Sequence, residues 1–347
     1  MSAENIETEI KSIFKERYST SKSTRSTYSR GEDTYDPVLS KAVIFPETNE
    51  EVSTVLKICN ERKVPVVPFG TGTSLEGNVV GNEEGITISL EKMNKILKVN
   101  VEDFDCRVQA NVTREQLNEY LREDGIFFPI DPGANAAIGG MAATSASGTM
   151  AVKYGTMKTV ITGLTVVLPN GDIINTGGRT KKTSAGYNLT NLFIGSEGTL
   201  AVSSKITLKL QPIPEHKVLG VCHFPKFYEA METTQHLVEL EPDAVELVDQ
   251  TMLELASEIP QFQDKLKRFV KGKPGSLLLV EFAGTELSPL KQKLKELDEL
   301  MKNHGFKDAV VEAIDPKLQK EVWDVRKSGL NIMMSMKGDG KPVSCIE

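Results

Sequence analysis

Two periodicities of apolar residues alternate along the first half of the chain. Continuous apolar runs at 42–45, 64–67 and 86–90 predict buried β-strands. The stretch that begins at Thr48 has apolar residues every three or four positions, and Thr48 with the glutamates that follow it is a typical helix start. This order predicts a β–α–β unit, and open sheets of this kind bind ligands at the carboxyl ends of their strands.

Turn signals divide the rest of the chain and mark a domain boundary. The residues Pro-Asn-Gly-Asp at 169–172 lie between two apolar runs and predict a β-hairpin, and a Thr-x-x-Gln capping box predicts a helix over 113–122. After the prolines near 212–214 glycines become rarer and helical periods longer. We therefore expect an N-terminal helix and arm at 1–37, a first domain at 38–214 and a second domain at 215–347.

Composition and charge exclude several classes of protein. The chain has 347 residues, 39% of them hydrophobic and 26% charged, as in an ordinary globular protein. Its formal net charge of −7, without a basic block, argues against a nucleic-acid partner. The four cysteines lie far apart, which predicts no metal or iron–sulfur site. The charged amphipathic start and the absence of a long apolar window predict a cytoplasmic protein, or one peripheral to a membrane.

Three stretches of very small residues stand out against this background. They lie at 68–77, 131–148 and 195–200 and consist largely of Gly, Ala, Ser and Thr. A P-loop needs a lysine directly after its last glycine, and the first stretch has none. A Gly-x-Gly-x-x-Gly fingerprint needs a third glycine where this stretch has Leu75. Glycine-rich surface turns are the alternative. Three such stretches favour backbone that approaches the diphosphate of a large, flat ligand.

The same stretches carry a resemblance to a known family. The order PFGTGTSLEG, DPGANAAIGGMAATSASGTMAVKYGTM, LPNGD and AGYNLTNLFIGSEGTLAV resembles the FAD-linked D-2-hydroxyacid dehydrogenases, which are vanillyl-alcohol-oxidase/PCMH-type flavoproteins. The resemblance implies an α+β protein in which a two-subdomain PCMH-type FAD-binding domain precedes a ferredoxin-like α+β cap domain. It also implies that the cap is partial and truncated, since family members continue with a histidine-rich segment that carries the proton-accepting histidine and, in several members, metal ligands.

The resemblance also implies which residues hold FAD. The first stretch cradles the diphosphate, the second lines the ring and ribityl side, and the third lies near the nucleotide. With no histidine near the first stretch, we expect the FAD to be non-covalent. The predicted cofactor-binding residues are Pro68, Gly70, Thr71, Gly72, Thr73, Ser74, Pro132, Gly133, Ala134, Gly139, Gly140, Ser145, Gly148, Glu197, Gly198 and Val202.

One arginine is the candidate for substrate binding. In the helix expected from Pro316 onward, Arg326 continues an apolar stripe at steps of four residues, so its charge needs a partner. That partner is either the substrate carboxylate, which the family binds with an arginine at this motif, or an acidic residue of the cap. For Lys337 and Lys341 we favour solvated surface positions. The four histidines show no metal-ligand spacing, and we assign no catalytic base.

These expectations define a leading function and two alternatives. The leading function is oxidation of a D-2-hydroxyacid, such as D-lactate, D-2-hydroxyglutarate or glycolate, to the 2-oxoacid, with electrons passed from FAD to an external acceptor (quinone, cytochrome or electron-transfer protein). The second is a flavin-binding subunit whose missing segment is supplied by a partner chain. The third is a non-catalytic FAD-binding module.

Overall fold

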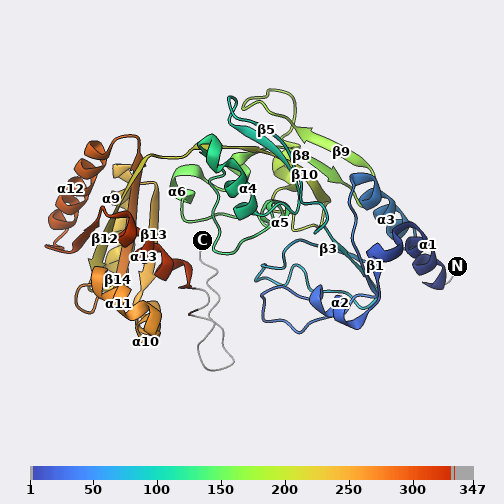
Figure 1. Cartoon of the computed structure of the whole chain (residues 1–347), viewed down its shortest axis with the longest axis horizontal. Coiled ribbons are helices and arrows are strands. Elements are labelled where there is room, and N and C mark those ends of the chain that lie inside the picture. The colour runs from blue at the N-terminus through green and yellow to red at the C-terminus, as the bar shows by residue number, and fades with distance from the viewer. Residues whose placement is uncertain (1–2, 330–331, 333–347) are drawn as a thin grey trace. The chain divides into compact units, whose positions relative to one another are not determined.

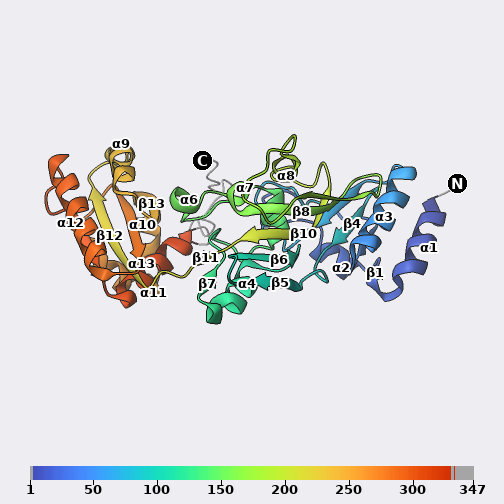
Figure 2. The same ribbon diagram turned by 90° about the horizontal axis from the view of Figure 1, so that it is seen from above.

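The computed structural model describes residues 3–329 and Ile332, and these form two compact units. Unit 1 contains the residues up to Gly148 together with Gly155–Pro212. Unit 2 contains Thr149–Tyr154 and the residues from Ile213 onward. Figure 1 follows the chain through both units, and Figure 2 gives the same ribbon from above. Each unit is described by itself.

The first sheet of unit 1 contains the expected β–α–β unit. Its strand order is β1-β2-β4-β3, with β2, β4 and β3 parallel and β1 antiparallel at the edge. The helix α3 begins after Thr48, whose Oγ1 accepts a hydrogen bond of 3.1 Å from the Glu51 backbone N–H, as predicted. The elements are α1 (Ala3–Phe14), η1 (Lys15–Arg17), β1 (Tyr18–Ser19), α2 (Lys22–Thr27), β2 (Ala42–Ile44), α3 (Asn49–Glu61), β3 (Val66–Phe69) and β4 (Ile86–Ser89).

The second sheet of unit 1 is antiparallel, in the order β5-β6-β10-β8-β9. The predicted hairpin joins β8 to β9, and Gly171 occupies the left-handed region there with φ of +87°. The capping box of α4 is also confirmed. The elements are β5 (Ile96–Asn100), β6 (Asp105–Gln109), α4 (Arg114–Leu121), η2 (Arg122–Asp124), β7 (Ile126–Phe127), β8 (Ile161–Val167), β9 (Ile173–Gly177), α8 (Leu189–Phe193), β10 (Val202–Lys209) and β11 (Gln211–Pro212).

Two stretches of unit 1 are more regular than their sequences suggested. The second small-residue stretch, expected as a loop, contains the helix α5 (Ile138–Ala143), and it is followed by α6 (Ala151–Tyr154) and α7 (Met157–Val160). Alanine is a strong helix former, which offsets the glycines of α5. The segment expected as an arm also contains a helix, α2, and its continuation lies against the first small-residue stretch, where the Glu32 N–H donates to the Ser74 carbonyl at 3.0 Å.

Unit 2 is built on a four-stranded antiparallel sheet in the order β13-β14-β12-β15. Two β–α–β halves, β12-α9-β13 and β14-α12-β15, give this order, which confirms the ferredoxin-like expectation. The elements are β12 (His216–Phe224), α9 (Phe227–Leu237), η3 (Val238–Leu240), β13 (Ala244–Asp249), α10 (Gln250–Glu258), α11 (Pro260–Phe269), β14 (Ser276–Gly284), α12 (Leu287–Asn303), β15 (Val310–Ala313) and α13 (Pro316–Lys327).

The two faces of this sheet carry separate apolar cores. On one face, residues of α9 and α12 pack with Phe224 and Phe282. On the other face, residues of α10, α11 and α13 pack with Leu277 and Leu279. Because successive residues of a strand point to opposite faces, β14 contributes to both cores.

No helix in the described part of the chain combines the length and the apolar character that a membrane crossing requires.

A buried carboxylate joins the segment 149–154 to the rest of unit 2. Lys153 of α6 forms an ion pair with Asp243, which directly precedes β13 and is only 4% exposed. Asp243 also accepts a hydrogen bond of 2.8 Å from the Ala283 N–H. Both interactions are charge-assisted and neither is fully solvated, so they stabilise the unit more than a surface pair would.

We predict that Asp243→Ala lowers the free energy of unfolding of unit 2 by about 1.5–3 kcal/mol, because it removes a charged partner from Lys153 and from the Ala283 N–H. Urea unfolding followed by Trp323 fluorescence measures this, since Trp323 is the one tryptophan in the sequence and lies in α13. The control is Asp264→Ala, which removes an exposed pair with Lys267 and should leave the midpoint unchanged. An equal midpoint for wild type and Asp243→Ala would contradict the prediction.

Candidate functional site

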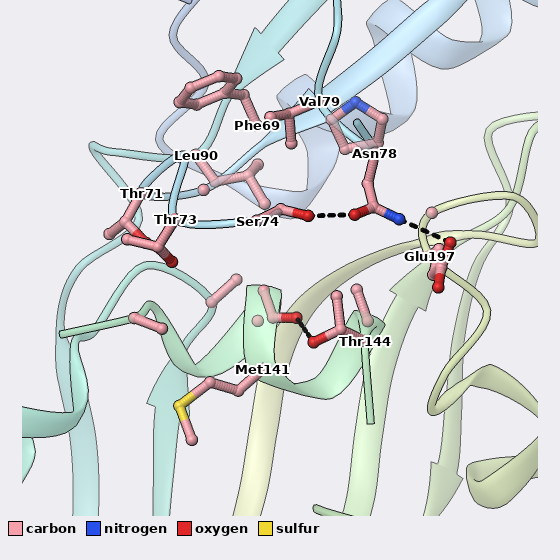
Figure 3. Close-up of a pocket in the computed structure, with 18 of the residues that line it drawn as sticks. Phe69, Thr71, Thr73, Ser74, Asn78, Val79, Leu90, Met141, Thr144 and Glu197 are labelled. Atoms are coloured by element: carbon pink, nitrogen blue, oxygen red, sulfur yellow. Dashed lines mark hydrogen bonds between the residues drawn. The ribbon is translucent and has the colours of Figure 1, made fainter. Parts of the chain in front are cut away.

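A cavity of about 210 Å³ in unit 1 is lined by all three small-residue stretches. One wall is the turn that follows β3, the opposite wall is α5, and the segment that precedes β10 closes one side. Figure 3 shows this arrangement, with the first stretch facing α5 across the open space. Thus the cavity lies at the carboxyl end of a parallel strand, where the β–α–β pattern predicted a ligand.

The first wall presents backbone and short hydroxyl side chains. Gly72 has φ of +71°, a conformation that favours glycine, and an added Cβ would lie 2.7 Å from the Phe69 ring. Thr71 Oγ1 accepts a hydrogen bond of 3.2 Å from the Ala137 N–H, so the turn is tied to the residue before α5. This hydrogen bond holds the backbone of the turn in place opposite α5.

The second wall depends on two adjacent glycines with different roles. An added Cβ at Gly139 would lie 2.7 Å from the Ala110 Cβ and 2.9 Å from the Ala110 carbonyl oxygen, so this glycine permits α5 to pack on the end of β6. An added Cβ at Gly140, which lines the cavity, would meet no atom within 4 Å. Gly139 therefore shapes the fold, whereas Gly140 leaves space for a ligand.

The third stretch is joined to the first by a hydrogen-bonded chain. Ser74 donates to Asn78 Oδ1, and Asn78 Nδ2 donates to Glu197 Oε2 at 2.6 Å, as Figure 3 shows. Glu197 has φ of +52°, which is uncommon for a residue other than glycine, and its N–H donates to the Ala143 carbonyl at 2.9 Å. Strained backbone of this kind persists when its surroundings hold it, and it concentrates at functional sites.

The structure brings most of the predicted cofactor residues to this one cavity. Those that line it are Pro68, Gly70, Thr71, Gly72, Thr73, Ser74, Pro132, Ala134, Gly139, Gly140, Glu197, Gly198 and Val202. Gly133, Ser145 and Gly148 are not among the lining residues. At Gly148 an added Cβ would lie 2.4–2.6 Å from atoms of Asp131, so close packing of two chain segments explains this glycine.

Several lining residues escaped the sequence analysis. They are Asn78, Val79, Leu90, Ala110, Met141, Ala143 and Thr144, among others. Val79, Leu90 and Ala110 have the pattern of ordinary core residues, whereas Met141, Ala143 and Thr144 lie inside the second small-residue stretch. Asn78 directly follows the Gly77 that ends the first stretch, and that position is the one signal that could have included it.

The candidate substrate residue lies in unit 2. Arg326 of α13 pairs with Glu246 of β13, at 2.6 Å from Nη2 and 2.9 Å from Nε, both to Oε2. The acidic partner that the sequence left as one of two options is therefore present. Lys337 and Lys341 lie outside the described residues.

Three free cysteines, Cys59, Cys106 and Cys222, are buried in the structure. Burial raises the pKa of Cys59 to about 12, and burial is also the main cause that raises the pKa of Cys106 to about 12. The pKa of Cys222 rises for the same reason. Because the thiolate is the reactive form, these side chains behave as core residues at neutral pH.

Comparisons with known proteins identify both parts of the chain. Residues 40–177 match the family model described as FAD binding domain, and residues 213–347 match that described as FAD linked oxidases, C-terminal domain. A mitochondrial D-lactate dehydrogenase [cytochrome] of Arabidopsis thaliana is 37% identical over 93% of this chain and 56% of its own length. A probable mitochondrial D-lactate dehydrogenase of Danio rerio is 38% identical over 92% of this chain and 63% of its own length.

The fold agrees with a solved structure of another protein. p-Cresol methylhydroxylase is 17% identical and superposes with a TM-score of 0.73 over 94% of this chain and 71% of that chain. This likeness, with the family matches, confirms the PCMH-type fold. The chain spans between half and two thirds of the length of the two D-lactate dehydrogenases.

The residues at the cavity fit FAD. The absence of a side chain at Gly140 leaves open space for a ligand, and the apolar Val79, Leu90 and Met141 suit a flat ring. Asn111 Oδ1 is buried and has no hydrogen-bond partner among the described residues, and it lies 3.9 Å from where a Cβ on Gly70 would be, so a donor beside this wall would satisfy it. The chain therefore contains an FAD-binding domain of PCMH-type fold, followed by the C-terminal domain of FAD linked oxidases.

Proposed function

We propose that the protein oxidises a D-2-hydroxyacid, namely D-lactate or a relative such as D-2-hydroxyglutarate or glycolate, to the 2-oxoacid. The observation that carries the proposal is the single cavity where three small-residue stretches of a PCMH-type domain meet. The relatives of more than 35% identity that are named D-lactate dehydrogenases support the choice of substrate class.

Each wall of the cavity has a separate task in this proposal. FAD, when bound, accepts the hydride from the substrate carbon. The backbone of 70–74 holds the diphosphate, and the small residues of 132–140 leave room for the ring system. Gly133, Ser145 and Gly148 support this wall from outside the cavity. Glu197 and its neighbours Gly198 and Val202 bind near the nucleotide.

Substrate binding and electron transfer complete the proposal. Arg326 binds the substrate carboxylate through its planar guanidinium, and among the described residues we assign no proton acceptor. Electrons pass to an external acceptor, a quinone, a cytochrome or an electron-transfer protein, and the word cytochrome in the name of the Arabidopsis relative supports this class. A cytoplasmic location stays a prediction, because both relatives are named as mitochondrial.

We predict that the purified protein carries FAD, not FMN, and releases it on acid precipitation. The sequence places none of its four histidines in the first small-residue stretch, so a histidyl–flavin bond cannot form there. Mass spectrometry of the supernatant and the absorbance of the washed pellet measure this. Flavin retained on the denatured chain, or FMN in the supernatant, would be the contrary result.

Gly140→Val should reduce FAD affinity more than tenfold, because the added side chain enters open space that the ligand needs. Fluorescence quenching during titration of apoprotein with FAD gives the affinity. Gly178→Val is the matched control, since an added Cβ at Gly178 also meets no atom within 4 Å and Gly178 does not line the cavity. Equal FAD affinity in the two variants would show that the cavity is not the FAD site.

Arg326→Lys should retain FAD but weaken substrate binding by about 1.5–3 kcal/mol, because lysine offers a point charge in place of the paired fork. Oxalate or a 2-oxoacid binding, followed through the absorbance of bound FAD, tests the anion site without requiring proton transfer. Binding that is equal in wild type and variant would make Arg326 a structural residue. A wild-type protein that binds no anion would favour a pocket completed by a partner chain.

A further inference from the structure

Glu246 is an acidic residue on the largely apolar face of the unit 2 sheet that α10, α11 and α13 cover, a face it shares with the buried Glu281. It lies in β13 opposite Leu279 of β14, two residues before Val248, and both of these belong to the core covered by α10, α11 and α13. Its side chain is 16% exposed. Partial burial of a carboxylate is costly unless a cation compensates it, and Arg326 provides that cation.

The pair uses only one edge of the arginine. Both contacts go to Oε2 of Glu246, from Nε at 2.9 Å and from Nη2 at 2.6 Å. A guanidinium has a second edge, formed by Nη1 and Nη2, which can donate two parallel hydrogen bonds to another carboxylate. Within the described part of the chain, no hydrogen bond or ion pair is recorded for Nη1.

Among the described residues, Gly329 places no side chain over this second edge. Gly329 has no side chain, and an added Cβ there would lie 3.6 Å from Arg326 Nη1 and 3.0 Å from the Met252 methyl carbon. The Arg326 side chain keeps 34% of its surface exposed. A partly exposed guanidinium that is fixed on one edge is preorganised to bind an anion on the other.

We propose that Glu246 is a positioning residue, which orients Arg326 so that its Nη1–Nη2 edge receives the carboxylate of the substrate. The inference rests on the proposed function, because it assumes that Arg326 binds this carboxylate. Glu246 opposes anion binding by its charge and favours it by holding the guanidinium. The orienting effect is the larger one, since an unheld arginine loses rotamer freedom on binding.

The test is the dissociation constant of oxalate for the FAD-loaded protein, measured by its perturbation of the flavin spectrum. Glu246→Ala should weaken oxalate binding by about threefold to tenfold, although it removes a negative charge next to the anion site. Glu246→Gln, whose amide oxygen can still accept from Nε and Nη2, should recover most of the affinity. If Glu246 had a purely structural role, oxalate affinity would not depend on an acceptor atom at this position. Glu246→Gln would then not bind oxalate more tightly than Glu246→Ala.

The control variant is Glu321→Ala, in the helix α13 that also carries Arg326. Glu321 pairs with Arg268 and its side chain is 15% exposed, close to the 16% of Glu246, so its loss tests general damage to unit 2. It should leave oxalate binding unchanged. Thermal unfolding and FAD content of every variant confirm that the proteins compared are folded.

Two outcomes separate this inference from the proposed function. If Arg326→Lys weakens oxalate binding and Glu246→Ala binds oxalate as tightly as wild type or more tightly, the positioning role is wrong and the function of Arg326 stands. If neither variant changes oxalate binding, both assignments are wrong. Equal weakening by Glu246→Ala and Glu321→Ala would also overturn the positioning role.

Discussion

Close approach of backbone segments is the constraint on which the cavity of unit 1 depends. Gly31, Gly139 and Gly148 each lie where an added Cβ would come within 2.4–2.7 Å of another segment, namely the Ser74 carbonyl, Ala110 and Asp131. Real Cβ atoms do not tolerate such distances, so larger residues would push the walls apart. These glycines set the positions of the walls, while Gly140 leaves the space between them open.

Local sequence patterns predicted those parts of the fold that local interactions determine. The Thr48 cap, the capping box of α4 and the hairpin turn at 169–172 each depend on a few neighbouring residues, and all three are present. The helix α5 and the chain Ser74–Asn78–Glu197 were missed. Asn78 and Glu197 are more than a hundred residues apart, so their contact depends on the tertiary fold and leaves no periodic signal.

The arginine of α13 shows a different limit of sequence reasoning. The apolar stripe of the helix that begins at Pro316 predicts a charged partner for Arg326. The sequence does not show whether that partner is a carboxylate of the protein or of the substrate. Since a guanidinium has two binding edges, the two options do not exclude each other, and Glu246 occupies only one edge. A sequence does not show which atoms of a side chain a neighbour contacts, so it cannot reveal that both partners fit one arginine.

The assignment of residues 149–154 to unit 2 has a consequence for how the two units are connected. The chain leaves unit 1 after Gly148, returns at Gly155 and leaves again after Pro212, so three peptide connections join the units. A single cleavage near Pro212 would therefore not divide the protein into two independent domains. A fragment starting at Ile213 would lack Lys153 and would leave the buried Asp243 without its cation. Topologically, unit 2 is a discontinuous domain, whose first segment directly follows the stretch that forms one wall of the cavity in unit 1.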